Sequence, residues 1–156
     1  MDKYLMTPEG HEHLKDELRR LKAERPRIVR EIAAAREHGD LSENAEYHAA
    51  KDRQGLTEAR ILELETKIGG AEVIDTTTLS GDRVQFGATV SIVDEDTEAE
   101  STYQIVGSDE ADASEGRLSI TSPLARALVG RSIGDSVELE TPGGRHTYEI
   151  TAVLYG

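Results

Sequence analysis

Two long heptad-patterned segments flank one short turn, and this arrangement constrains the fold more than any other feature of the sequence. Apolar residues recur in both segments at spacings of three and four, the pattern of helices that each carry one apolar seam. The seam residues are Leu14, Leu18, Leu21, Ile28, Ile32 and Ala35 in the first segment, and Tyr47, Ala50, Gln54, Thr57, Ile61, Leu64 and Ile68 in the second. Folding the chain at residues 39–41 brings the seams face to face, with Leu18 opposite Leu64.

This matched register favours an antiparallel hairpin within one chain over a dimeric coiled coil, and we expect a monomer. Arg25 opposite Thr57 makes one poor layer of the seam, and such polar seam positions lower stability but fix the register. Pro26 removes one backbone hydrogen bond, so the first helix is expected to bend or break locally there.

Helix signals set the limits of the hairpin. Thr7 is a plausible N-cap with Pro8 at the first helical position, so the first helix should run from Pro8 to His38, about 45 Å at 1.5 Å per residue. The second helix should run from about Ser42 to Ile68, before Gly69-Gly70 stops it.

The turn between the helices concentrates acidic residues at the tip of the hairpin. Gly39 can end the first helix in a left-handed conformation, and Asp40 or Ser42 can cap the second. Asp40 and Glu43 have the spacing of a capping box, and spacing alone favours this structural role. Two carboxylates at a tip could also share Mg²⁺, provided that a partner supplied further ligands.

Charge and composition narrow the functional classes. Residues 1–75 carry 13 basic and 17 acidic side chains, whereas residues 76–156 carry 5 and 14. A chain with this excess of acidic residues repels nucleic-acid backbones at long range. Any contact with nucleic acid should therefore be local, made by the first half of the chain, or indirect, through a protein partner. Cysteine is absent, which excludes disulfides and cysteine-based metal sites. With no membrane-spanning run and no signal peptide, we expect a cytoplasmic protein.

After Gly69-Gly70 the pattern changes to short β-branched runs separated by Gly, Asp and Pro turns. Strands are predicted at residues 84–86, 89–93, 102–106, 118–120, 136–139 and 146–153, with a short helix from Pro123 to Leu128. The expected fold class is α+β, a small antiparallel sheet packed on one helix. We expect a hairpin domain at residues 1–75 and a globular domain at residues 76–156. The acidic segment between Asp94 and Glu100 is interpreted as a solvated hairpin loop.

No complete active site is visible in the sequence. The chain has no His-Glu-x-x-His, P-loop, G-x-S-x-G or G-x-G-x-x-G motif. Basic residues flank the tip, and most such charges are solvated helix faces, although some could contact the phosphates of RNA held by a partner. They are Arg27, Arg30, Arg36, Lys51 and Arg53.

Two runs carry a resemblance to a known family. Ile32 to Tyr47, followed by Ala49-Ala50-Lys51, resembles the hairpin signature of the bacterial GreA/GreB transcript cleavage factors. Ser119 to Gly130 resembles the C-terminal signature of the same family. The resemblance covers essentially the whole chain and is closer to the GreA branch, because the hairpin is not strongly basic.

The resemblance implies a coiled-coil hairpin that enters the secondary channel of bacterial RNA polymerase and an FKBP-like domain that docks at the channel rim, on the largest catalytic subunit. It places the acidic pair at Asp40 and Glu43, with Ser42 as an auxiliary group, and has the pair hold a Mg²⁺ jointly with the polymerase. Free protein would bind no stable metal.

The same resemblance implies that the polymerase itself then hydrolyses backtracked RNA, so the protein completes an active site and is not an enzyme alone. Arg36, Lys51 and Arg53 would face the 3′ end of the nascent RNA. Ser122 and Pro123, at the start of the short helix, would lie on the polymerase-binding surface. No membrane partner is implied.

Three other functions remain open at this stage. A channel-blocking inhibitor on the same fold should differ in its tip acids, whereas Asp40-Leu41-Ser42-Glu43 matches the cleaving members. A prolyl isomerase needs an aromatic-lined pocket, which Phe86, Tyr103, Tyr148 and Tyr155 without any Trp poorly provide. A structural adaptor would bind polymerase without shortening RNA.

Overall fold

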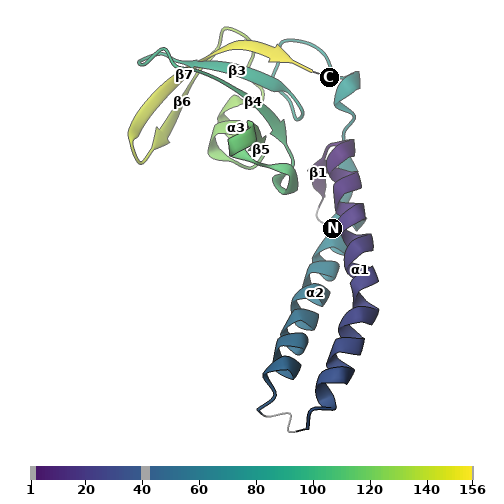
Figure 1. Ribbon diagram of the computed structural model, residues 1–156. Coiled ribbons are helices and arrows are strands. Elements are labelled where there is room, and N and C mark those ends of the chain that lie inside the picture. Colours follow the sequence, from purple (N-terminus) through teal and green to yellow (C-terminus); the bar gives the residue numbers. More distant parts are fainter. Residues whose placement is uncertain (1–2, 40–42, 156) are drawn as a thin grey trace. The chain divides into compact units, whose positions relative to one another are not determined.

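The computed structural model describes residues 3–39 and 43–155, and the chain divides into two units (Figure 1). One unit contains residues 11–71, and the other contains residues 4–10 together with the chain from residue 72 onward. The first turn of the first helix therefore groups with the globular unit, although the sequence suggested one hairpin domain over residues 1–75.

The hairpin consists of two long helices, α1 (Pro8–Arg36) and α2 (Ala45–Gly69). Thr7 is confirmed as the cap of α1, because its Oγ1 accepts a hydrogen bond of 3.1 Å from the backbone N–H of Gly10. The helix continues through Pro26, so the expected local break does not occur. Proline has no backbone N–H and so removes one helical hydrogen bond. The hydrogen bonds of the neighbouring turns and the packing of the seam keep α1 continuous at this position.

Burial along the two helices follows the predicted seams. The buried hydrophobic residues of α1 and α2 are Leu14, Ile28, Ala35, Ala50, Ile61 and Leu64, all of them predicted seam positions. Leu18 and Leu21 are only partly buried. The apolar stripe is thus narrow, and burial of this stripe holds the two helices together.

Ion pairs beside the seam confirm an antiparallel pairing within one chain. Arg25 donates two hydrogen bonds of 2.8 Å to Glu58, the neighbour of its predicted seam partner Thr57. Arg60 donates two more of 2.8 Å to Glu17. These hydrogen bonds hold the pKa of Glu58 and Glu17 below the usual range, because the guanidinium groups favour the charged carboxylates.

A two-stranded sheet, which the sequence did not predict, joins residues from the two ends of the hairpin sequence. It pairs β1 (Tyr4–Met6) with β2 (Ala71–Val73), and the N–H of Ile74 donates to the carbonyl of Met6 at 2.9 Å. Each strand has only three residues, too few for the alternation of polar and apolar residues that marks longer strands.

The globular unit is built on a five-stranded sheet with the order β5-β4-β3-β7-β6. Its strands are β3 (Thr89–Asp94), β4 (Glu100–Val106), β5 (Arg117–Ser119), β6 (Ser136–Thr141) and β7 (Gly144–Leu154). The α+β class is confirmed. In this sheet all pairs are antiparallel except β4–β5, which is parallel, and residues 84–86 do not form the predicted strand.

One short helix, α3 (Pro123–Leu128), packs its Ala125 and Leu128 into the core of this unit. Single-turn 3₁₀ helices at Thr76–Thr78, Ser108–Glu110 and Ala113–Glu115 connect the remaining segments. The core is formed by the inward faces of β3, β4, β6 and β7 together with α3. Alternate residues of β3 are buried, as expected for a strand with one covered face.

The acidic loop between β3 and β4 is solvated at all positions except its first. Asp94 is buried, and its carboxylate accepts the N–H groups of Asp96 and Thr97 and bonds to His146 Nδ1 at 3.2 Å. These hydrogen bonds lower the pKa of Asp94, and the one from the Asp96 N–H has the largest effect. Asp94 therefore shapes the turn, and the residues that follow remain exposed.

Candidate functional site

The tip of the hairpin is the candidate site, and the structure describes part of it. Asp40, Leu41 and Ser42 lie outside the described residues. The chain leaves α1 through a backbone hydrogen bond of 3.3 Å from the Gly39 N–H to the Arg36 carbonyl. Gly39 has φ of 102°, so the predicted left-handed turn after α1 is confirmed.

The cap of α2 is Asn44 rather than Asp40 or Ser42. Its side-chain oxygen accepts a hydrogen bond of 3.0 Å from the N–H of Tyr47, and α2 begins at Ala45. The side-chain amide also donates to the Ala35 carbonyl at 2.6 Å, in the last turn of α1. Asn is a strong cap, and an amide side chain can both accept from one helix and donate to the other.

This cap removes the structural alternative for Glu43. A capping box needs its acid at the third helical position, whereas Glu43 precedes the cap itself. Glu43 is exposed, and its carboxylate has no hydrogen bond or ion pair with another described residue. Glu46 differs, because its carboxylate lies 3.4 Å from His38 Nε2. The Glu43 carboxylate is therefore available to a ligand or partner.

The three predicted RNA-facing cations line two different grooves between the helices. Arg36 and Lys51 share one groove with Tyr47, and the Arg36 guanidinium lies 6.0 Å from the centre of the Tyr47 ring. Lys51 Nζ also donates to Gln54 Oε1 at 3.2 Å. Arg53 lines a second groove and forms an ion pair with Glu31.

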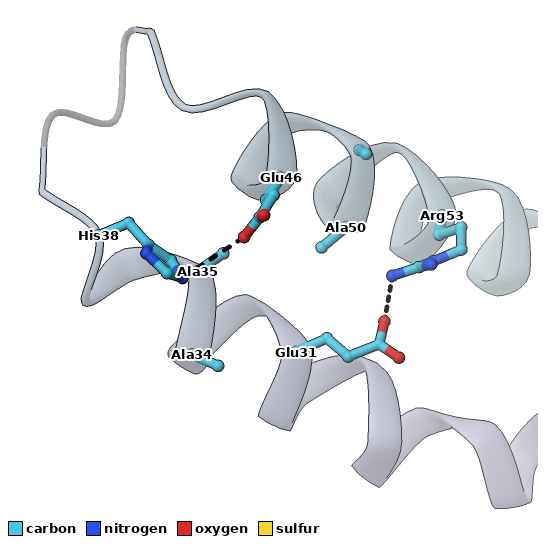
Figure 2. Close-up of a pocket in the computed structure, with 8 residues that line it drawn as sticks. Glu31, Ala34, Ala35, His38, Glu46, Ala50 and Arg53 are labelled. Atoms are coloured by element: carbon cyan, nitrogen blue, oxygen red, sulfur yellow. Dashed lines mark hydrogen bonds and ion pairs between the residues drawn. The ribbon is translucent and has the colours of Figure 1, made fainter.

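Figure 2 shows this second groove, with the Glu31–Arg53 pair at one end and the His38–Glu46 pair nearer the tip. Alanines Ala34, Ala35 and Ala50 lie between the two pairs. Because Arg53 is already neutralised by Glu31, Arg36 and Lys51 are the cations best placed to meet an anion.

Ser122 and Pro123 begin α3 as the sequence predicts. Ser122 is the N-cap, and its Oγ accepts a hydrogen bond of 3.2 Å from the N–H of Ala125. Pro123 occupies the first helical position, where its missing N–H costs no hydrogen bond. Pro123 is exposed and Ser122 is half-buried. The local roles of both residues are therefore structural, and the exposed proline ring is open to a partner.

The described residues hold no ready-made metal centre. No group of three or more acidic or histidine side chains lies close enough to bind a metal within residues 3–39 and 43–155. Mg²⁺ prefers carboxylate oxygens and keeps several waters, so the uncommitted carboxylate of Glu43 fits such an ion only as one ligand among several. A metal at this position would need further ligands besides Glu43.

Asn44 is the tip residue that sequence reasoning missed as a cap. The sequence feature that could have identified it is its position just ahead of Tyr47, the first seam residue of α2, with only one turn's start between them. Asp40 and Ser42 were equally good caps by type, and only their distance from the first helical residue separates the three.

We expect Asn44→Ala to lower the free energy of unfolding of the hairpin by about 1–2 kcal/mol, because the cap hydrogen bond of α2 and the bond to Ala35 are both lost. Asn44→Asp should cost less, since aspartate keeps the cap and loses only the donor. Chemical denaturation of the full chain followed by circular dichroism measures both changes. A wild-type midpoint for Asn44→Ala would contradict the cap assignment.

Comparisons with known proteins identify the class. Residues 4–73 match the family model for the N-terminal region of transcription elongation factors, and residues 79–155 match the C-terminal GreA/GreB model. The chain is 64% identical over 156 residues to the transcription elongation factor GreA of Beijerinckia indica and 60% identical to that of Brucella canis, with 99% of each chain covered.

A solved structure, the GreA factor homolog 1 protein of Thermus thermophilus, is 26% identical and covers 98% of this chain and 99% of its own, with a TM-score of 0.45. The two family models are models of transcription elongation factors. The chain belongs to the GreA/GreB family of these factors.

No helix in the described part of the chain has the length and apolar character needed to cross a membrane.

Proposed function

We propose that the protein stimulates the intrinsic RNA cleavage activity of bacterial RNA polymerase and thereby rescues backtracked, arrested complexes. The hairpin enters the secondary channel of the polymerase and presents its tip at the active site. The globular domain docks at the channel rim, on the largest catalytic subunit. The polymerase performs the hydrolysis, and this chain supplies groups that its active site lacks.

The observation that carries the proposal is the exposed carboxylate of Glu43, which has no partner among the described residues and stands at the far end of a two-helix arm. A carboxylate at the end of the arm that stabilises no part of the fold is suited to bind a group of another molecule. With Asp40, and with Ser42 as an auxiliary group, it would hold a Mg²⁺ jointly with the polymerase. A second metal in such a site activates water and stabilises the charge that develops on the phosphate.

Cations on the arm support contact with the RNA. Arg36 and Lys51 share one groove near the tip, so both can approach the phosphates of a nascent 3′ end. Arg53 would take part only if it exchanged Glu31 for a phosphate, because the two form an ion pair. The resulting order of importance is Arg36 and Lys51 first, and Arg53 second.

The direct test uses purified full-length protein and a stalled, backtracked complex of bacterial RNA polymerase with 3′-labelled RNA. The expected result is Mg²⁺-dependent release of short 3′ fragments at a rate well above that of polymerase alone. Stoichiometric binding without any shortening of the RNA would instead support the structural adaptor, and binding that slows cleavage would support the channel-blocking inhibitor.

A further inference from the structure

The two grooves near the tip differ in how their cations are held. Arg36 and Lys51 line the first groove, and their partners there are an aromatic ring and a side-chain amide, both uncharged. Arg53 lines the second groove, where it is bound by the carboxylate of Glu31 from the opposite helix. We call the first the open groove and the second the paired groove. Arg53 must give up a carboxylate before it can bind another anion.

The Glu31–Arg53 pair links α1 and α2 at one end of the paired groove (Figure 2). The Arg53 side chain is 56% exposed, and that of Glu31 is 41% exposed. An ion pair in such contact with water contributes little to stability, so breaking this one costs little. A phosphate can replace the carboxylate, because a guanidinium binds both groups through parallel N–H donors. Glu31 therefore competes for Arg53 and does not block it permanently.

Another ion pair between the same helices lies farther from the tip. Arg25 binds Glu58, and these side chains are 45% and 46% exposed. Measured along α2 from its start at Ala45, Arg53 lies at about 12 Å and Glu58 at about 20 Å. The two pairs have the same chemistry and similar exposure, and they differ in their distance from the tip. The Arg25–Glu58 pair is therefore a matched comparison for any effect of Glu31 on function.

We propose that Glu31 is a specificity-determining residue, which weakens contact between Arg53 and RNA and so directs the phosphates of the nascent 3′ end to the open groove. A phosphate that enters the paired groove must displace the Glu31 carboxylate and then lies beside a like charge. Neither cost arises where Arg36 and Lys51 bind. This inference rests on the proposed function, since it concerns how the same arm meets the same RNA.

The alternative for this pair is a purely structural role, in which the bond between α1 and α2 only fixes their register. That role predicts that loss of the Glu31 charge lowers stability or leaves it unchanged, and that it never improves the action of the protein on RNA. The proposal instead predicts a gain, because Arg53 becomes a free cation near the tip.

The test measures cleavage of 3′-labelled RNA in a stalled, backtracked polymerase complex against the concentration of full-length protein. Glu31→Gln keeps the shape of the side chain and removes its charge. It should lower the concentration that gives half-maximal cleavage by about twofold to fivefold, as expected for one exposed charge pair. The maximal rate should stay at the wild-type value, because the tip is unchanged. Affinity for RNA-free core polymerase should not change either, which assigns the gain to RNA.

Two comparisons assign the gain to Arg53. Glu58→Gln alters the net charge by the same amount and frees Arg25, and it should cleave like the wild type. In a chain that carries Arg53→Gln, the further change Glu31→Gln should have no effect, because the cation that Glu31 restrains is gone. Circular dichroism at the assay temperature checks that each variant is folded.

A wild-type half-maximal concentration for Glu31→Gln would overturn the inference and leave the proposed function standing. An equal gain from Glu58→Gln, or a gain that persists beside Arg53→Gln, would also overturn it, because either result traces the gain to net charge. An equal gain in affinity for RNA-free polymerase would do the same, since no RNA is then involved. Failure of the wild-type chain to stimulate cleavage would overturn the proposed function and this inference together.

Discussion

Asp40→Asn and Glu43→Gln are each expected to abolish stimulated RNA cleavage almost completely while leaving affinity for polymerase unchanged. Each substitution removes a charge and keeps the shape of the side chain, so a site that needs a carboxylate for Mg²⁺ loses one ligand. Because Asn44 caps α2, neither change disturbs the described cap, and stability should stay at the wild-type value. Cleavage rate, polymerase affinity and thermal midpoint, measured on the same preparations, separate these effects.

Magnesium provides the second readout for the tip. A weakened site can be refilled by mass action, so raised Mg²⁺ should partly restore cleavage in both variants. Glu37→Gln is the matched control, since Glu37 is an exposed acid of the same turn outside the proposed pair. It should cleave like the wild type at every Mg²⁺ concentration. Wild-type cleavage by Asp40→Asn would leave this turn with a structural role alone.

The sequence predicted the hairpin well because heptad spacing is a local and repeated signal. Six seam residues are buried, the cap at Thr7 and the start of α3 are confirmed, and the pairing of the helices follows from matching two seams across one turn. The cap of α2 was predicted wrongly because Asp40, Ser42 and Asn44 are all good caps. Only the position of the first helical residue, Ala45, selects among them.

Contacts between residues far apart in the sequence could not be predicted in this way. Glu110 accepts hydrogen bonds from the backbone N–H and the hydroxyl of Thr7, across a separation of 103 residues. The parallel alignment of β5 on β4 likewise depends on a crossover, because a run of three residues carries no information on strand direction. The contact of residue 84 with residues 130 and 131 has the same origin, since it exists only through backbone hydrogen bonds between two distant segments.

The candidate site was predicted unevenly. Asp40 and Glu43 came from a family resemblance, and spacing alone favoured a capping role. The structure adds the cap at Asn44, which frees Glu43, and the pairing of Arg53 with Glu31, which separates Arg53 from Arg36 and Lys51. Ion pairs between helices depend on rotamers and on the helix register, so a list of charged residues near a turn does not reveal which of them remain available.

The second large effect concerns the seam that holds the arm together. Leu64 is fully buried, so its truncation leaves a cavity between the two helices. Leu64→Ala should therefore lower the free energy of unfolding by about 2–5 kcal/mol. Leu62 is the matched control on the same helix, since it is 67% exposed. Leu62→Ala should change stability by about 0.5 kcal/mol or less, as is usual for surface substitutions. Urea denaturation followed by circular dichroism at the helix minimum compares the two.

The same pair of variants also tests how the arm relates to function. If an intact hairpin is needed to carry the tip into the polymerase, Leu64→Ala should lose stimulated cleavage as temperature approaches its reduced midpoint, while Leu62→Ala retains it. Docking by the globular unit should persist in both, because the five-stranded sheet and its core lie outside the seam. Equal stability losses for Leu64→Ala and Leu62→Ala would contradict the seam, since only one of these leucines faces the partner helix.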